Sequence, residues 1–97
     1  MARKYLRITE VTEICGVDKA FILHLERESL ITPTVRQNEK FYTRDQVDRV
    51  RVARLLIEEM GVNLEGAEVA LHMREQMIAM QRQFNELLRL LGQNLKR

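Results

Sequence analysis

Residues 16–33 read GVDKAFILHLERESLITP, and this stretch decides the fold. Gly16 is placed to end one helix, and Asp18 suits the N-cap of the next because its carboxylate can accept from free backbone N–H groups. The apolar residues of that second helix share one face at helical spacing; they are Phe21, Ile22 and Leu25. Two short helices separated by a tight glycine turn indicate a helix-turn-helix.

The segment before this turn supplies the first helix. Residues 5–8 predict a short strand or an extended lead-in, and Thr9 is the predicted N-cap of the first helix. That helix should turn three residues inward, namely Val11, Ile14 and Cys15. Cys15 is the only cysteine, so the sequence offers no intramolecular disulfide and no cysteine-rich zinc site.

The segment after the turn predicts a small β wing. Pro33 biases Thr32 toward an extended conformation and so ends the second helix region. Residues 35–36 and 41–42 flank the polar stretch QNEK, as in a two-stranded hairpin. Thr43 then fits a capping box, in which Gln46 reaches back to the backbone of the cap. A helix should therefore begin at residue 44.

Two further helices complete the predicted chain. The first should bury a stripe formed by Val47, Val50, Ala53, Ile57 and Met60, and Gly61 should end it in a left-handed conformation. Asn63 should cap the last helix, which continues to about residue 95 and would be about 50 Å long.

The last helix carries a heptad pattern that predicts a homodimer. Apolar residues alternate steps of four and three along it; they are Met73, Met77, Met80, Phe84, Leu87 and Leu91. A helix of this length outruns the small domain, so a second copy of the chain is its expected partner. We predict two parts, a winged helix-turn-helix over residues 1–61 and a dimerisation and partner-binding helix over residues 62–97.

Composition narrows the class of protein. The chain has 97 residues and a formal net charge of +2, with acidic and basic residues mixed throughout. That is a weak electrostatic footprint for a duplex binder. No apolar run approaches the roughly 18 residues of a membrane span, so we expect a cytoplasmic protein without membrane contact. No nucleophile–base set or ligand cluster stands out, and we expect no catalysis, metal or cofactor.

The order of these elements resembles the MerR superfamily of winged-helix regulators over essentially the whole chain. The stretches that carry the resemblance are ITEVTEICGV (8–17), LITP (30–33), KFYTRDQVDRV (40–50) and EEMGVNLEGAEVAL (58–71). The resemblance implies an all-α fold with a small β wing and a long C-terminal dimerisation helix. The chain ends after that helix, so we expect no small-molecule effector.

Departures from the family pattern point to a branch of it. DNA-binding members carry an Arg and two aromatics in the second helix, where this chain has Leu23, His24 and Leu25. Their wing has an Arg after Gly-Tyr, where this chain has Lys40 before Phe41. The closing segment is similar to CbpM-like chaperone modulators, which bind the J-domain of a DnaJ/CbpA-like co-chaperone and inhibit it. The HspR-like heat-shock repressors, which bind DNA, are the alternative.

Two sets of candidate contact residues follow. The candidate contacts to a DNA duplex are Lys19, His24, Arg27, Arg36, Lys40 and Tyr42. The alternative is an ordinary solvated surface, on which these residues are neutralised by Asp18, Glu26, Glu28 and Glu39. A basic J-domain helix would meet Glu65, Glu68 and Glu75, whose alternative role is helix solubility. Leu23 should lie on the outward face of the second helix, as a plain exposed leucine or as an apolar contact for a protein partner.

Overall fold

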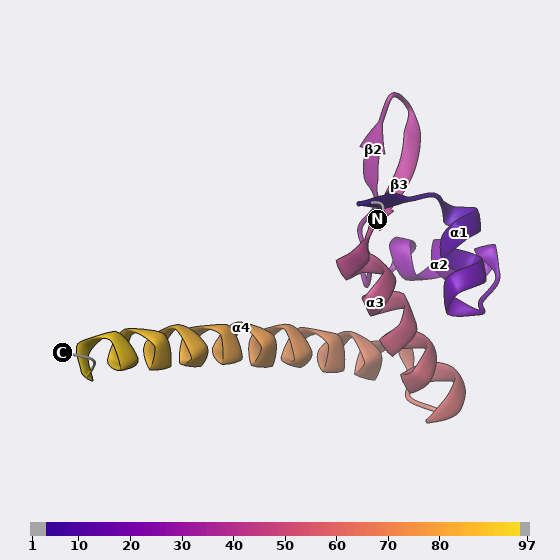
Figure 1. Ribbon diagram of the computed structural model, residues 1–97. Coiled ribbons are helices and arrows are strands. Elements are labelled where there is room, and N and C mark those ends of the chain that lie inside the picture. The colour runs from indigo at the N-terminus through magenta and orange to yellow at the C-terminus, as the bar shows by residue number, and fades with distance from the viewer. Residues whose placement is uncertain (1–3, 96–97) are drawn as a thin grey trace.

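The computed structural model describes residues 4–95 and has the predicted architecture, mostly helical with a small sheet. The elements are β1 (Tyr5–Leu6), α1 (Ile8–Cys15), α2 (Lys19–Arg27), β2 (Thr34–Arg36), β3 (Glu39–Thr43), α3 (Arg44–Arg54), the π-helical turn η1 (Leu55–Glu59) and α4 (Leu64–Leu95). The outermost residues of the two predicted parts, 1–3 and 96–97, lie outside the described range. In Figure 1, α4 leaves the other elements and extends far beyond them.

The helix-turn-helix forms where the sequence predicts it. Gly16 has φ 67° and its N–H donates to the Thr12 carbonyl, while Asp18 Oδ1 accepts from the Phe21 N–H at 2.8 Å. Positive φ favours glycine because a Cβ crowds the backbone there. Buried side chains on both helices then meet in one core, which includes Val11, Cys15, Ile22 and Leu25.

Two predictions for α1 were wrong. The helix begins at Ile8 with Arg7 as its N-cap, because the Arg7 N–H donates to Glu10 Oε1 at 3.0 Å, whereas Thr9 already lies in the first turn. Ile14 is 45% exposed. It lies about 60° round the helix from Val11, at the edge of the buried face rather than at its centre.

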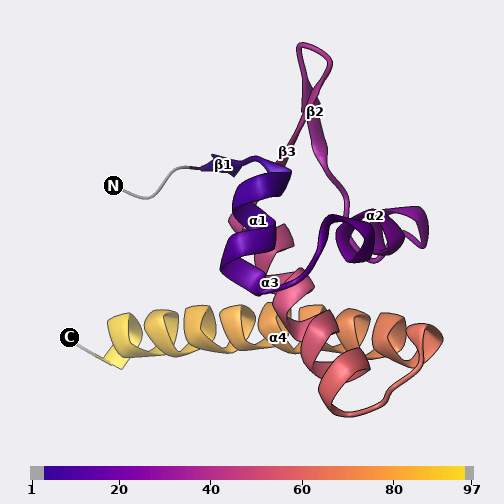
Figure 2. The same cartoon turned by 90° about the vertical axis from the view of Figure 1, so that its right-hand side faces the viewer.

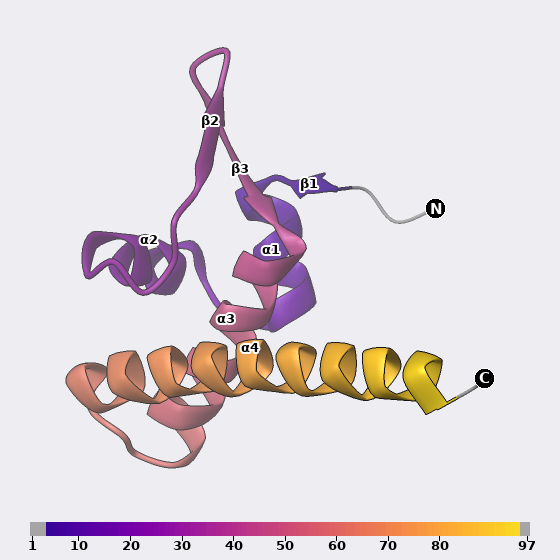
Figure 3. The ribbon, with the colours of Figure 1, turned by 90° about the vertical axis from the view of Figure 1, so that its left-hand side faces the viewer.

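The sheet has three antiparallel strands in the order β1-β3-β2, so the lead-in strand joins the predicted hairpin. Gln37 and Asn38 form the hairpin turn with φ 51° and 66°, the left-handed pair that matches the twist of the flanking strands. β2 and β3 project from the helices on the side away from α4, as Figures 2 and 3 show from opposite directions. This projection is the wing.

The predicted capping box before α3 forms only in part. Thr43 Oγ1 accepts from the Gln46 N–H at 3.4 Å, as predicted. The Gln46 side chain does not return to Thr43; its Oε1 accepts from the Thr32 N–H at 2.8 Å. Gln46 therefore ties α3 to the segment that joins α2 to the wing.

The stripe predicted on α3 is correct for its first three residues, since Val47, Val50 and Ala53 are buried. Ile57 is only half-buried and Met60 is 64% exposed, which corrects the prediction at its end. The cause is η1, because a π-helical turn holds more residues than an α-helical turn and rotates the following side chains off the stripe.

The junction to α4 uses the predicted residues. Gly61 has φ 70°, and Asn63 Oδ1 accepts from the Gly66 N–H at 2.7 Å. The first turns of α4 join the core through Ala67 and Leu71, and beyond Leu71 none of its described side chains is fully buried. No helix within residues 4–95 is long and apolar enough to cross a membrane.

Candidate nucleic-acid and partner interfaces

The helix α2 presents a partly basic face to solvent. Lys19, His24 and Arg27 are all exposed, and Leu25, at one of the positions that are aromatic in DNA-binding members, is fully buried in the core. Leu23 is half-buried instead of exposed, which corrects the prediction for this side chain. Lys19, His24 and Arg27 therefore lie on the solvent face of α2, as the sequence predicted.

Glu26 fastens α2 to the wing. Its Oε2 accepts from the Tyr42 hydroxyl at 2.7 Å and its Oε1 pairs with Lys40 Nζ at 3.0 Å, while the Glu26 side chain is only 10% exposed. Burial raises the pKa of the Tyr42 phenol well above its usual range, and the hydrogen bond to the Glu26 carboxylate raises it further. The three side chains form one polar link between a helix and a strand.

This link corrects the duplex-binding set at Tyr42. The residue is fully buried and its hydroxyl is used by Glu26, so it has no surface to offer a duplex. Strand alternation is the reason, because Phe41 faces outward and its neighbour must face the core. Lys40, in contrast, keeps a side chain that is 51% exposed.

The expected balance of charge on this surface is also different. Asp18 is occupied as a helix cap, Glu26 is turned inward, and Glu39 pairs with Arg7 at 3.2 Å. Of the four acids expected to neutralise the face, Asp18 and Glu28 are exposed and have no ion pair within the described residues. Because Glu26 is turned inward, the solvent face of α2 carries one acid fewer than the sequence suggested.

Arg36 lies apart from the other candidate duplex contacts. Its Nη2 donates to the Tyr5 hydroxyl at 3.0 Å, and its Cζ lies 4.4 Å from the centre of the Tyr5 ring. Arg36 pairs in register with Glu39, whereas Lys40 is the next residue along β3 and faces the other way. Arg36 and Lys40 thus occupy opposite faces of the wing.

The three candidate acidic contacts on α4 divide into two groups. Glu65 and Glu68 are exposed on the first turns, and neither has an ion pair within residues 4–95. Glu75 instead pairs with Arg49 of α3, whose Nε donates to the Leu30 carbonyl at 2.7 Å. Arg49 was missed in the sequence because its role depends on three segments that only the folded chain brings together.

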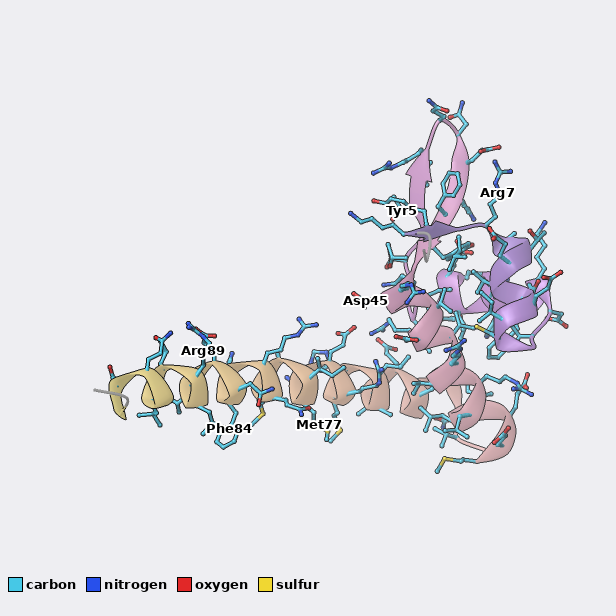
Figure 4. All side chains as sticks on the ribbon, in the orientation of Figure 1. Tyr5, Arg7, Asp45, Met77, Phe84 and Arg89 are labelled. Atoms are coloured by element: carbon cyan, nitrogen blue, oxygen red, sulfur yellow. The ribbon has the colours of Figure 1, made fainter. Side chains whose placement is uncertain are left out.

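Between α3 and α4 lies a groove of about 310 Å³. Its charged lining has both signs, with Asp45, Asp48 and Glu75 near Arg49, Arg74 and Arg82. Figure 4 shows Asp45 on the side of the groove that α3 forms. The mixture favours no ligand of a single charge, and no group of three or more His, Cys, Asp or Glu side chains in residues 4–95 is placed to hold a metal ion.

The heptad stripe of α4 faces away from the helix-turn-helix. In Figure 4, Met77 and Phe84 project from the side of α4 opposite Arg89, away from the helix-turn-helix and the wing. All six stripe residues are exposed, from 47% at Leu91 to 67% at Met77 and Met80. The single chain therefore leaves this apolar surface uncovered.

Comparison with protein families identifies the family to which this architecture belongs. The model of the MerR HTH family regulatory proteins matches residues 6–89, from β1 into the last turns of α4. The chain belongs to this MerR family. No curated protein matches its sequence. Membership in this regulatory family agrees with the helix-turn-helix formed by α1 and α2 and with the wing that follows it.

Proposed function

We propose that this MerR family protein is a chaperone modulator, which binds the J-domain of a DnaJ/CbpA-like co-chaperone and inhibits it. The observation that carries the proposal is an acidic corner where η1 meets α4. Glu59, Glu65 and Glu68 are exposed there and have no ion pair within the described chain. Two large apolar side chains lie in the same short stretch, Met60 at 64% and Val69 at 59% exposure.

This corner has the composition expected of a docking site for a basic amphipathic helix. Apolar side chains supply the buried contact, and a charged rim steers a partner of opposite sign and sets its orientation. Leu23 on α2 also supports a protein partner, because a leucine can make no hydrogen bond to a phosphate or a base edge. Glu75 lies outside the proposed contact because Arg49 occupies it.

The test is binding of the full chain to a purified J-domain, measured by calorimetry. The double variant Glu65→Lys and Glu68→Lys should weaken binding about tenfold or more, because two attractive charges become repulsive. Glu13→Lys is the matched control, since Glu13 is an exposed acid on α1. Wild-type protein should also reduce the co-chaperone's stimulation of its Hsp70 ATPase. Failure to bind any J-domain, or equal binding by the charge-reversed variant, would contradict the proposal.

The second candidate is a DNA-binding regulator of heat-shock genes, similar to the HspR-like repressors. The observation that favours it is the solvent face of α2, where Lys19, His24 and Arg27 are exposed while Glu26 is turned inward. Such a protein should bind operator duplex with a steep salt dependence, and Lys19→Ala or Arg27→Ala should weaken it. Tight, sequence-selective duplex binding at physiological salt would replace the first proposal with this one.

For either function we propose a homodimer formed through α4. The uncovered heptad stripe supports it, because an apolar seam repeated over nearly three heptads is the pattern of a coiled-coil interface. A contiguous exposed apolar surface of this kind is also unusual for a monomer.

A further inference from the structure

The sheet has an outer face that neither proposed function relies on, although Arg36, one of the candidate duplex contacts, lies on it. Tyr5 pairs with Thr43, Phe41 with Thr34, and Arg36 with Glu39, so these side chains all lie on one face. The opposite face carries Leu6, Lys40 and Tyr42, which meet the core and Glu26 of α2. The outer face therefore points away from α2.

Two aromatic rings form the centre of this outer face. The rings of Tyr5 and Phe41 are 6.4 Å apart at 71°, an edge-to-face pair, and both side chains are half-buried. Tyr5 comes from β1 and Phe41 from β3, so the pair exists only because β1 joins the hairpin.

Three cations surround the two rings. Arg36 Cζ lies 4.4 Å and Lys4 Nζ 5.7 Å from the centre of Tyr5, and Arg7 Cζ lies 5.6 Å from the centre of Phe41. These are cation–π distances. Two acids lie beside these three cations: Glu39 pairs with Arg7, and Glu10 Oε1 accepts from the Arg7 backbone N–H. The surface consequently keeps an excess of positive charge.

We propose that this outer face binds single-stranded nucleic acid. Aromatic rings on which bases stack, combined with cations that contact the phosphates, are the two features that such binding requires. On binding, the guanidinium groups of Arg7 and Arg36 would move from the rings to the phosphates, and bases would take their places on the rings. An acidic peptide without aromatic side chains would satisfy the charges but leave the pair of aromatic rings unused.

The surface is separate from any duplex site on α2. Glu26 holds the inner face of β3 against α2 through Tyr42 and Lys40, so a duplex on α2 would leave Tyr5 and Phe41 on the far side of the wing. The two activities can therefore be measured separately by substitutions on opposite faces.

The test is fluorescence anisotropy of a labelled oligo-dT of about 12 nucleotides, within the range of known single-strand sites. Tyr5→Leu removes one stacking surface and should weaken binding about 5- to 150-fold. Arg36→Gln should weaken it while leaving both rings in place. With up to three phosphates neutralised, the slope of log affinity against log salt should be roughly −2. Arg82→Gln on α4 is the matched control and should leave the affinity unchanged, and Lys19→Gln tests whether the oligonucleotide binds on α2 instead.

Circular dichroism of each variant checks that the sheet and helices are retained, and Arg36→Gln gives an answer even if Tyr5→Leu loosens β1. Oligo-dT binding that is absent at low salt would overturn the proposal. So would binding that depends on Lys19 but not on Tyr5 or Arg36. Displacement of the oligonucleotide by a poly-glutamate peptide, with no effect of Tyr5→Leu, would show a purely electrostatic surface and would also overturn it.

Discussion

Tyr42→Phe tests whether the link through Glu26 holds α2 against the wing. The Tyr42 ring is fully buried and its hydroxyl donates to Glu26 Oε2 at 2.7 Å. Phenylalanine keeps the ring packing, so the change removes one hydrogen bond to a charged group. Such a bond contributes about 1.5–3 kcal/mol, and we expect a loss of roughly 2 kcal/mol in the free energy of unfolding at neutral pH. For a chain of this length, Tm should fall by about 8–16 °C.

The same hydroxyl should give the protein an alkaline sensitivity. Burial and the neighbouring Glu26 raise the pKa of Tyr42 in the folded state, whereas an unfolded tyrosine ionises near pH 10. Because the folded pKa is the higher one, the contribution is fully present below about pH 10 and is lost as the pH rises toward the folded value. Above about pH 10, wild-type stability should fall by about 1.4 kcal/mol per pH unit from this group alone. Tyr42→Phe lacks this component.

Urea unfolding followed by circular dichroism measures both effects, at neutral pH and in steps from about pH 9 to 11. All samples need one protein concentration, because dimerisation would add to the apparent stability. Tyr5→Phe is the matched control, since it removes the only other tyrosine hydroxyl and keeps Tyr42. A neutral-pH loss below about 0.5 kcal/mol, or an equal alkaline decline in wild type and Tyr42→Phe, would refute the reasoning.

Three further predictions concern the turns and α4. Asn63→Ala should lower stability by about 1 kcal/mol in thermal unfolding, because the N-cap bond is lost, and unchanged stability would contradict the cap. Gly16→Ala should cost about 1–2 kcal/mol because φ is 67°, whereas Gly92→Ala within α4 should gain roughly 0.5–1 kcal/mol; equal effects would contradict the strain argument. Phe84→Glu should convert the proposed dimer to a monomer in sedimentation, and Arg89→Glu on the opposite side of α4 should not. A monomeric wild type would disprove the dimer.

The candidate interfaces were only partly visible in the sequence. Lys19, His24, Arg27, Glu65 and Glu68 are exposed as predicted, because each lies on the polar side of a regular helix. Their roles stay predictions. The period of two in a β-strand would have separated Phe41 from Tyr42, and that signal was available before the structure. The aromatic outer face of the sheet was missed because residues 5–8 were not assigned a partner strand.

The sequence by itself determined most turns and caps of this protein, the N-cap of α1 excepted. Gly16, Asp18, Thr43, Gly61 and Asn63 each act on backbone atoms within a few residues, so local pattern is sufficient to identify them. It also determined the uncovered heptad stripe, since helical periodicity fixes which residues share a face.

Only the tertiary structure decided where several side chains point. Glu26 turns toward the wing because Tyr42 and Lys40 reach it from β3, and Gln46 leaves its own cap for the Thr32 N–H. Met60 leaves the buried stripe because a π-helical turn precedes it. Each outcome depends on contacts between segments distant in the chain or on a change of helical pitch, and neither is encoded in a local repeat. The positions of these side chains therefore could not be predicted from the sequence pattern.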